Sequence, residues 1–332
     1  MHSVHPFAAT SAARAGRLCL VAAAIFLVSV PAAAETGTLP PGLYLEAEGQ
    51  IVFGESRFEA GIVPDDIFGF TGPKAELDEG NGPGGALAIG YTWGNGWSAA
   101  VRYRLLKGDD KAGRFDPGIL TFGAGMDLVP GGFMVGVLDA RTEVESKTSI
   151  VDLEVGKDIA VGGGHLQVFG GLTYASIERD VAIIDDCGCI PFSMLFSNDF
   201  HGVGPKIGLR GGVPLNTTIS LVGSASAAAL FGTSKFATRL DDPLSPPFPY
   251  KDEDDRTVAA LDAQAGVAVA VGPGSLTFGY RIDALVGALD TDQRVSPLFQ
   301  SAGLAPIGDK HTDFVAHGPF ARFTLPLAAV GN

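Results

Sequence analysis

The sequence predicts an all-β protein, an antiparallel transmembrane β-barrel of ten strands. Apolar and polar residues alternate along segments close to the ~9–11 residues that a tilted membrane strand needs. The polar side of this alternation carries few charges, and charged residues make up only 18% of the 332-residue chain. The connections alternate between short and long, as in barrels whose strands run up and down across a membrane.

The first 34 residues are predicted to be a signal peptide rather than part of the fold. Arg14 and Arg17 precede an apolar run over residues 18–30, and Ala32-Ala33-Ala34 provides small residues for cleavage before Glu35. A single membrane anchor is the alternative, although the run is shorter than the roughly 20 residues of a spanning helix. Residues 35–332 then form the barrel domain of an exported protein of a Gram-negative outer membrane.

The exported chain is strongly acidic. Its net charge falls from −14 to −16 when the two arginines leave with the signal peptide. An acidic protein is a poor partner for nucleic acid, so we expect no nucleic-acid binding. No later stretch has the ~18 consecutive apolar residues of a helical membrane span.

The first predicted strand is "LYLEAEGQIVF", residues 43–53. Leu43, Leu45 and Ile51 fall on one face, whereas Glu46 and Glu48 fall on the other. A soluble sheet would turn the apolar face inward, and a membrane barrel would turn it toward lipid. Nine further segments follow, of which the last alternates poorly and has unassigned faces: 86–93, 97–105, 149–159, 165–176, 203–210, 218–230, 259–271, 275–286 and 313–325.

The connections identify the two ends of the barrel. Short turns, "GNG", "AVGGG", "PLN" and "GPG", are expected on the periplasmic side. Long extracellular loops are expected at 54–83, 107–142, 177–199, 232–256 and 288–311. Segment 118–140 is ambiguous, because a hairpin turning at "VPGG" would give twelve strands. Either even number returns both chain ends to the periplasmic side.

Aromatic residues gather beside the first short turn. Tyr91, Trp93, Trp97 and Tyr103 flank Gly94-Asn95-Gly96, where an interfacial girdle of a membrane barrel would lie. The alternative is a lipocalin-like or sandwich protein with these residues in an ordinary core. The sparse polar face and the continuous apolar face favour lipid outside and a polar lumen inside.

Several segments resemble a known family. These are "SIVDLEVGKDI" with "LQVFGGLTYASIE", then "FHGVGPKIGLRGGVPL", "LVGSASAAALFG", "FGYRIDALVGALDT" and "HGPFARFTL". In this order, over about residues 148–325, the chain is similar to the Legionella-type major outer-membrane protein family. The resemblance implies a pore-forming protein of the outer membrane. One departure is that the chain runs past Phe323 into "TLPLAAVGN" instead of ending on an aromatic residue.

The predicted function is passive diffusion of small hydrophilic solutes or ions, with a preference for cations. Charged side chains that line a pore set its ion selectivity. The alternative is a filled lumen in which these charges pair and hold the barrel, because about eight strands give a filled interior and about 16–18 an open channel. The predicted pore-lining residues are Glu46, Glu48, Arg102, Arg104, Asp152, Glu154, Lys206, Arg210, Asp262, Arg281 and Asp283.

Two other functional classes stay open. One is an outer-membrane enzyme of protease or lipase type, for which Asp185, Asp186 and His201 could form a rim site. No catalytic motif supports it, so we expect no enzymatic activity. The other is a structural or adhesive barrel that uses its long loops and conducts nothing.

No cofactor or metal site is predicted. Cys187 and Cys189 in "DDCGC" are too few to close a zinc site, and a local disulfide is the simpler interpretation. The acidic segment 241–255 could bind divalent cations among lipopolysaccharide phosphates, although a solvated loop is favoured. The expected partners are outer-membrane lipids, lipopolysaccharide and small solutes or ions; the sequence leaves the oligomeric state open.

Overall fold

The structure is a computed structural model that describes residues 40–56, 78–110, 114–115, 140–185, 193–242, 245–290 and 311–327. The predicted signal peptide, both cysteines of "DDCGC" and most of segment 118–140 lie outside these residues, so these predictions remain as they stand. Among the described residues there is no helix with the length and apolar composition needed to cross a membrane.

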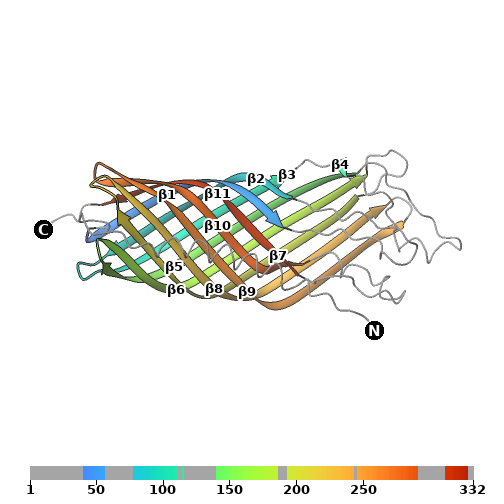
Figure 1. Ribbon diagram of the computed structural model, residues 1–332. Coiled ribbons are helices and arrows are strands. Elements are labelled where there is room, and N and C mark those ends of the chain that lie inside the picture. The colour runs from blue at the N-terminus through green and yellow to red at the C-terminus, as the bar shows by residue number, and fades with distance from the viewer. Residues whose placement is uncertain are drawn as a thin grey trace, which may run out of the picture.

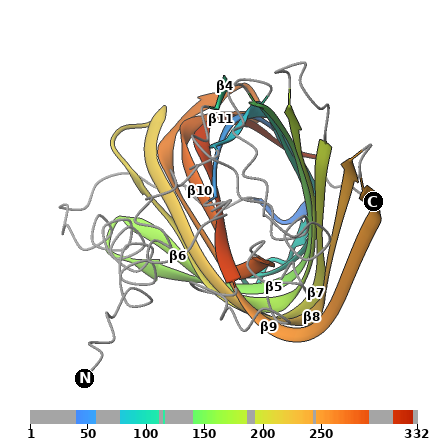
Figure 2. The same ribbon diagram turned by 90° about the vertical axis from the view of Figure 1, so that its right-hand side faces the viewer.

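The chain forms a closed antiparallel barrel (Figures 1 and 2). Neighbouring strands pair in the order β3-β2-β1-β11-β10-β9-β8-β7-β6-β5, and β3 pairs with β5 to close the ring. The two-residue strand β4 (Arg114–Phe115) only borders β5. The ten long strands are β1 (Gly42–Ser56), β2 (Asp78–Thr92), β3 (Trp97–Asp110), β5 (Ala140–Val161), β6 (Gly164–Asp185), β7 (Ser193–Pro214), β8 (Ile219–Asp242), β9 (Ser245–Val271), β10 (Gly274–Asp290) and β11 (His311–Pro326).

The ten-strand prediction is confirmed, and the twelve-strand alternative is wrong for the barrel wall. β3 pairs directly with β5 from Trp97↔Lys157 to Asp110↔Val144. No strand therefore separates β3 from β5 in the ring.

The faces of the strands are inside-out relative to a soluble barrel. Leu87 and Ile207 point outward and are 65% and 70% exposed, whereas Asp152 points inward and is 0% exposed. The predicted aromatic residues Trp93 and Trp97 also point outward. This arrangement confirms the predicted lipid-facing surface, and it rejects a lipocalin-like or sandwich core.

The short turns lie where the sequence predicts them, at residues 93–96, 162–163, 215–218 and 272–273. Two of the predicted long loops, however, consist mostly of strand. β6 continues to Asp185 and β7 begins at Ser193, while β8 and β9 continue to Asp242 and from Ser245. As a result β5 to β9 contain 22 to 27 residues each and extend past β1 and β11 (Figure 1).

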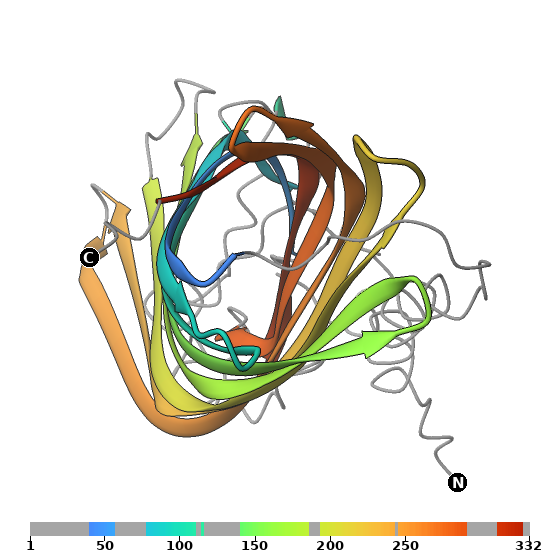
Figure 3. The same cartoon turned by 90° about the vertical axis from the view of Figure 1, so that its left-hand side faces the viewer.

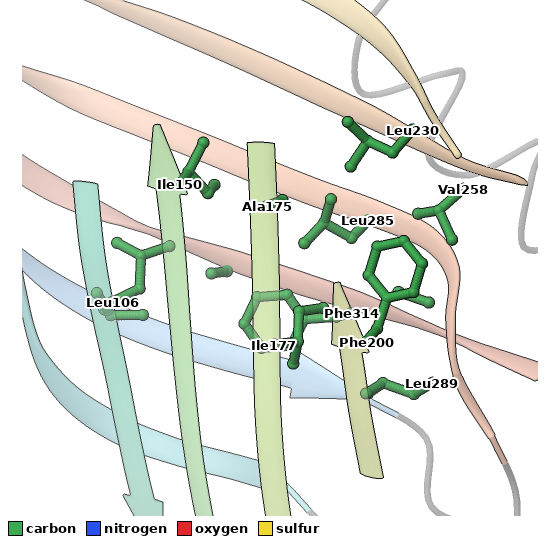
Figure 4. Close-up of a cluster of buried hydrophobic side chains, with 13 residues drawn as sticks. Leu106, Ile150, Ala175, Ile177, Phe200, Leu230, Val258, Leu285, Leu289 and Phe314 are labelled. Atoms are coloured by element: carbon green, nitrogen blue, oxygen red, sulfur yellow. The ribbon is translucent and has the colours of Figure 1, made fainter. Parts of the chain in front are cut away.

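The barrel therefore has two halves of opposite polarity. We call the part beside the short turns the turn half and the part beyond it the loop half; on β5 they meet between Ile150 and Val151. In the turn half the outward residues are mostly apolar, and the inward residues include many charged side chains. In the loop half the outward residues include Lys147 and Glu178, while the interior holds an apolar cluster that includes Leu106, Ile177, Phe200, Leu230, Val258 and Phe314 (Figure 4).

Candidate functional site: the lumen of the turn half

A layer of paired charges fills the lumen of the turn half. All eleven residues predicted to line a pore have their side chains in this interior, where they are buried or nearly so. Strand alternation turns them inward, and each lies on the turn side of the apolar cluster residue of its own strand. The structure adds Arg322 of β11, which the sequence analysis left unassigned.

Arg104 connects opposite walls of the barrel. Its strand β3 lies five strands from β9 in either direction around the ring. The Arg104 guanidinium donates to Asp262 on β9 at 2.8 Å, to Asp283 on β10 at 2.5 Å and to Asp152 on the neighbouring β5 at 3.1 Å. These contacts bridge the lumen at the level of the charge layer.

Two further groups of ion pairs flank Arg104. On one side, Lys206 of β7 contacts Asp152 and Glu154 at 3.0 Å each, and Arg210 donates to Glu154 at 2.7 Å. Thr173 donates its hydroxyl to the same Asp152 carboxylate at 2.6 Å. This group holds β5, β6 and β7 together from the inside.

The opposite group links β9, β10, β11 and β1. Arg281 contacts Glu48 at 3.0 Å and also pairs with Asp262, and Arg322 donates through Nε to Glu48 at 2.7 Å. Arg102 pairs separately with Glu46 at 2.6 Å. Buried ion pairs persist only where geometry and hydrogen bonds offset desolvation, and here each charge has at least one oppositely charged partner.

The charge layer is electrically balanced. The eleven predicted residues hold one more acid than base, and this excess led to the expected cation preference. Arg322 removes the excess, so the layer contains six basic and six acidic side chains. At this level the twelve charges therefore have no acidic excess, and the cation preference stays a prediction. Counting inward positions two residues apart from Thr324 would have identified Arg322.

A polar vestibule of about 410 Å³ opens at the turn end of the barrel (Figure 3 looks into this end). Its walls include Glu46, His165, Gln167, Arg210 and Arg322, and the charge layer forms its inner boundary. A second cavity of about 20 Å³ lies beside Arg104, between the charge layer and small residues such as Ala228 and Ala260. A space of that size holds about one water molecule.

A second polar group lies in the loop half and was missed by sequence reasoning. Arg256 of β9 donates to both carboxylate oxygens of Asp290, at 2.7 and 2.6 Å, and His311 Nδ1 lies 3.0 Å from Asp290. Ser234 and Asn198 also contact Asp290. These residues fall in or beside segments predicted to be loops, where alternation could not assign a face.

The proposed enzymatic residues are not brought together by the described part of the barrel. His201 points outward on β7 and is exposed, and the side chains of residues 185 and 186 lie outside the described set. His317 also faces outward, where Tyr280 Oη lies 2.5 Å from its Nδ1. Among the described residues, no three His, Cys, Asp or Glu side chains are arranged to hold a metal ion.

The closed antiparallel ring, the apolar outer belt and the aromatic residues beside the short turns define an outer-membrane β-barrel protein. The chain belongs to the family described as Legionella pneumophila major outer membrane protein precursor, whose model matches residues 42–326. The match also includes the N-terminal strands, which the sequence resemblance over about 148–325 did not reach. No curated protein matches the chain significantly.

Solved structures with a similar fold are other membrane barrels. The outer membrane protease OmpT from Escherichia coli has a TM-score of 0.52 and 12% identity, covering 88% of this chain and 99% of that one. The P. putida toluene transporter TodX has a TM-score of 0.36 and 9% identity, covering 87% and 91%. A major outer membrane protein from Thermus thermophilus has a TM-score of 0.30 and 12% identity, covering 82% and 98%. At this identity the likeness to OmpT shows the fold alone.

Proposed function

We propose that the protein is a narrow, porin-like pore that admits small hydrophilic solutes or ions through the outer membrane and is closed at rest. The observation that carries this proposal is the charged lumen of the turn half. Replacing buried ion pairs by apolar residues is often neutral or stabilising, so a barrel that only needed a filled core has no need of twelve interior charges. A polar lumen that begins in a 410 Å³ vestibule suits the passage of hydrated solutes.

Arg104 is the proposed constriction of this pore. Its contacts with Asp262 and Asp283 bridge the lumen, so they set the width of the passage at this level. Because the charge layer is balanced, we expect only weak ion selectivity at this level, weaker than the acidic excess of the eleven predicted residues suggests. Outside the barrel, the proposed partners are lipids around the turn half and lipopolysaccharide on the extracellular side.

The experiment is single-channel recording of the refolded mature protein in planar bilayers. The double variant Arg104→Ala/Asp283→Ala removes one charge of each sign and shortens both crossing side chains. We expect a unitary conductance at least about twofold above that of the wild type, because the constriction widens without a net charge change.

The matched control is Lys147→Ala/Glu178→Ala. This pair also removes one charge of each sign, from an exposed ion pair of 3.2 Å on the outer surface. We expect its conductance to equal that of the wild type. Absence of any current from the wild type and both variants would overturn the pore proposal.

A non-conducting structural or adhesive barrel is the second candidate. It is favoured by the apolar cluster of the loop half, which occupies the lumen above the charge layer. It predicts that no current appears even after Arg104 is removed. We propose no catalytic role. Asp290 lies next to His311, but both of its carboxylate oxygens accept hydrogen bonds from Arg256.

A further inference from the structure

The last part of β10 leaves the barrel wall and enters the lumen. Pairing of β10 with β9 ends at Val286↔Ala259, although β9 continues outward to Ser245 in its pairing with β8. Beyond this point strand alternation is lost, and residues 288–290 are all buried. Figures 2 and 3 show this orange-red end of β10 inside the ring.

Polar contacts hold this end against strands β7, β8 and β9. Asn198 of β7 makes two reciprocal bonds with the Asp290 backbone: its Nδ2 donates to the carbonyl and its Oδ1 accepts from the N–H, both at 2.9 Å. Ser234 of β8 donates to the Asp290 carboxylate at 2.8 Å, and Arg256 of β9 donates to both oxygens. Strands β7, β8 and β9 therefore converge on one residue at the tip of β10.

Apolar contacts complete the closure. Leu285, Ala288 and Leu289 of β10 and Phe314 of β11 belong to the same buried cluster as Phe200 of β7 (Figure 4). Apolar constrictions close channels because water is unstable between their walls. The tip of β10 thus supplies one side of an apolar seal, and strands β7 to β9 supply the other with Phe200, Leu230 and Val258.

The backbone of β10 bends where the tip begins. The β10–β11 register shifts between Leu285 and Leu289, and Gly287 has φ of +73°, a conformation that other residues rarely adopt. The Gly287 N–H donates to Asp313 at 2.8 Å, and Arg256 donates to its carbonyl at 3.2 Å. This bulge is fixed by side chains rather than by a continuous strand ladder.

We propose that residues 287–290 of β10 with 311–313 of β11, here called the inner arm, are the extracellular gate of the pore. The inner arm closes the lumen when Asp290 is bound by Asn198, Ser234 and Arg256, and it swings toward the wall about the bulge at Gly287 when those bonds break. This inference rests on the proposed pore function and adds its regulation. The gate controls how often the pore opens, whereas Arg104 controls how much passes.

The test weakens the latch without touching Arg104. In the variant Asn198→Ala/Ser234→Ala three hydrogen bonds to Asp290 are lost, and we expect the open probability in planar bilayers to rise by about tenfold or more, with unchanged unitary conductance. The control Ser197→Ala/Thr233→Ala alters the neighbouring outward positions of the same two strands. We expect it to behave as the wild type.

A second readout follows the inner arm itself. Ala288, which is 1% exposed, is replaced by cysteine in protein that also carries Cys187→Ser and Cys189→Ser. A charged, membrane-impermeant maleimide should label Ala288→Cys slowly in the latched protein and at least about tenfold faster when Asn198→Ala/Ser234→Ala is added. Refolding is checked by the same labelling in denaturant, where both proteins must react fully.

The outcomes separate the gate from the pore. Currents whose open probability is the same in latch and control variants overturn the gate and leave the pore in place. Equal labelling of Ala288→Cys with and without the latch bonds also overturns the gate, because the inner arm is then a fixed part of the wall. Absence of current in every variant overturns the pore, and the gate with it.

Discussion

The two halves of the barrel use the same strands with opposite polarity. On β5, Leu153 and Val155 are exposed in the turn half, whereas Glu145 and Lys147 occupy the equivalent outward positions in the loop half. The inward positions change in the opposite sense, from Asp152 to Ile150 over a single step of two residues. The surroundings, rather than strand geometry, therefore decide which face is apolar.

The solvent around each half also explains why the interior is apolar in the loop half and charged in the turn half. Burial of apolar side chains stabilises a sheet only where the alternative is water. In the loop half water surrounds the strands, so an apolar interior holds them together as in a soluble barrel. In the turn half lipid already accommodates apolar side chains, and the interior can hold paired charges such as Arg104 with Asp262.

The largest expected effect on the free energy of unfolding comes from removing a charge of one sign from the charge layer. Arg104→Ala leaves Asp152, Asp262 and Asp283 short of a partner, and removal of one partner from a buried ion pair typically costs about 3–5 kcal/mol. Adding Asp283→Ala should restore part of this loss by returning the layer to balance. Reversible unfolding of the protein in lipid vesicles, followed by Trp fluorescence and titrated with denaturant, measures both free energies. Equal destabilisation by the single and double variants would contradict a charge-balanced layer.

A smaller effect distinguishes the outer surfaces of the two halves. Ile207→Lys places a charge on the lipid-facing surface of the turn half, which costs about 2–4 kcal/mol near the bilayer centre. Thr233→Lys places the same charge at an outward position of the loop half, and we expect a change within about 0.5 kcal/mol. The same vesicle unfolding experiment compares them. If both substitutions cost the same, the boundary between lipid and water does not lie between these residues.

The turn half could be predicted in detail because two solvents enforce alternation there. Along a strand every second residue faces the same side, so one inward charge predicts that the residue two positions away also faces inward. This rule places Asp152 and Glu154 inside and Leu153 outside. Arg322 was missed because Gly318-Pro319 interrupts the pattern of its strand. Sequence could indicate that Arg104 points inward, but its reach to Asp262 depends on ring closure, which no local pattern encodes.

The loop half could not be predicted in this way. Its outward residues, such as Lys147 and Glu178, are those of a solvated loop, so the alternation that marks a membrane strand is absent. β8 and β9 are strands as far as the pair Leu240↔Phe248 because they hydrogen-bond to each other. The pattern of either segment alone does not show this pairing. The contacts of Asn198 with Asp290 depend on a bend in β10 and join residues 92 positions apart.

The smallest expected effect concerns one carboxyl group on the outer surface of the loop half. Burial raises the pKa of Asp199 above its ordinary value, and the nearby carboxylates of Asp180 and Glu178 raise this pKa further. A raised carboxyl pKa means that the folded state favours the protonated form. The contribution of Asp199 to stability is therefore present below the ordinary Asp pKa of about 3.9 and is lost as pH rises through the raised value.

Asp199→Asn should accordingly stabilise the protein at pH 7 by a fraction of a kcal/mol, since the group is partly solvent-screened, and should change nothing at pH 3. Denaturant midpoints of wild type and variant at the two pH values measure this difference. The control Glu253→Gln removes another carboxylate near Lys235, at 3.8 Å, and should give no gain at either pH. Loss of stability in Asp199→Asn at pH 7 would mean that attraction to Lys235 outweighs burial and the neighbouring carboxylates, and that the charges on this surface stabilise the loop half by pairing.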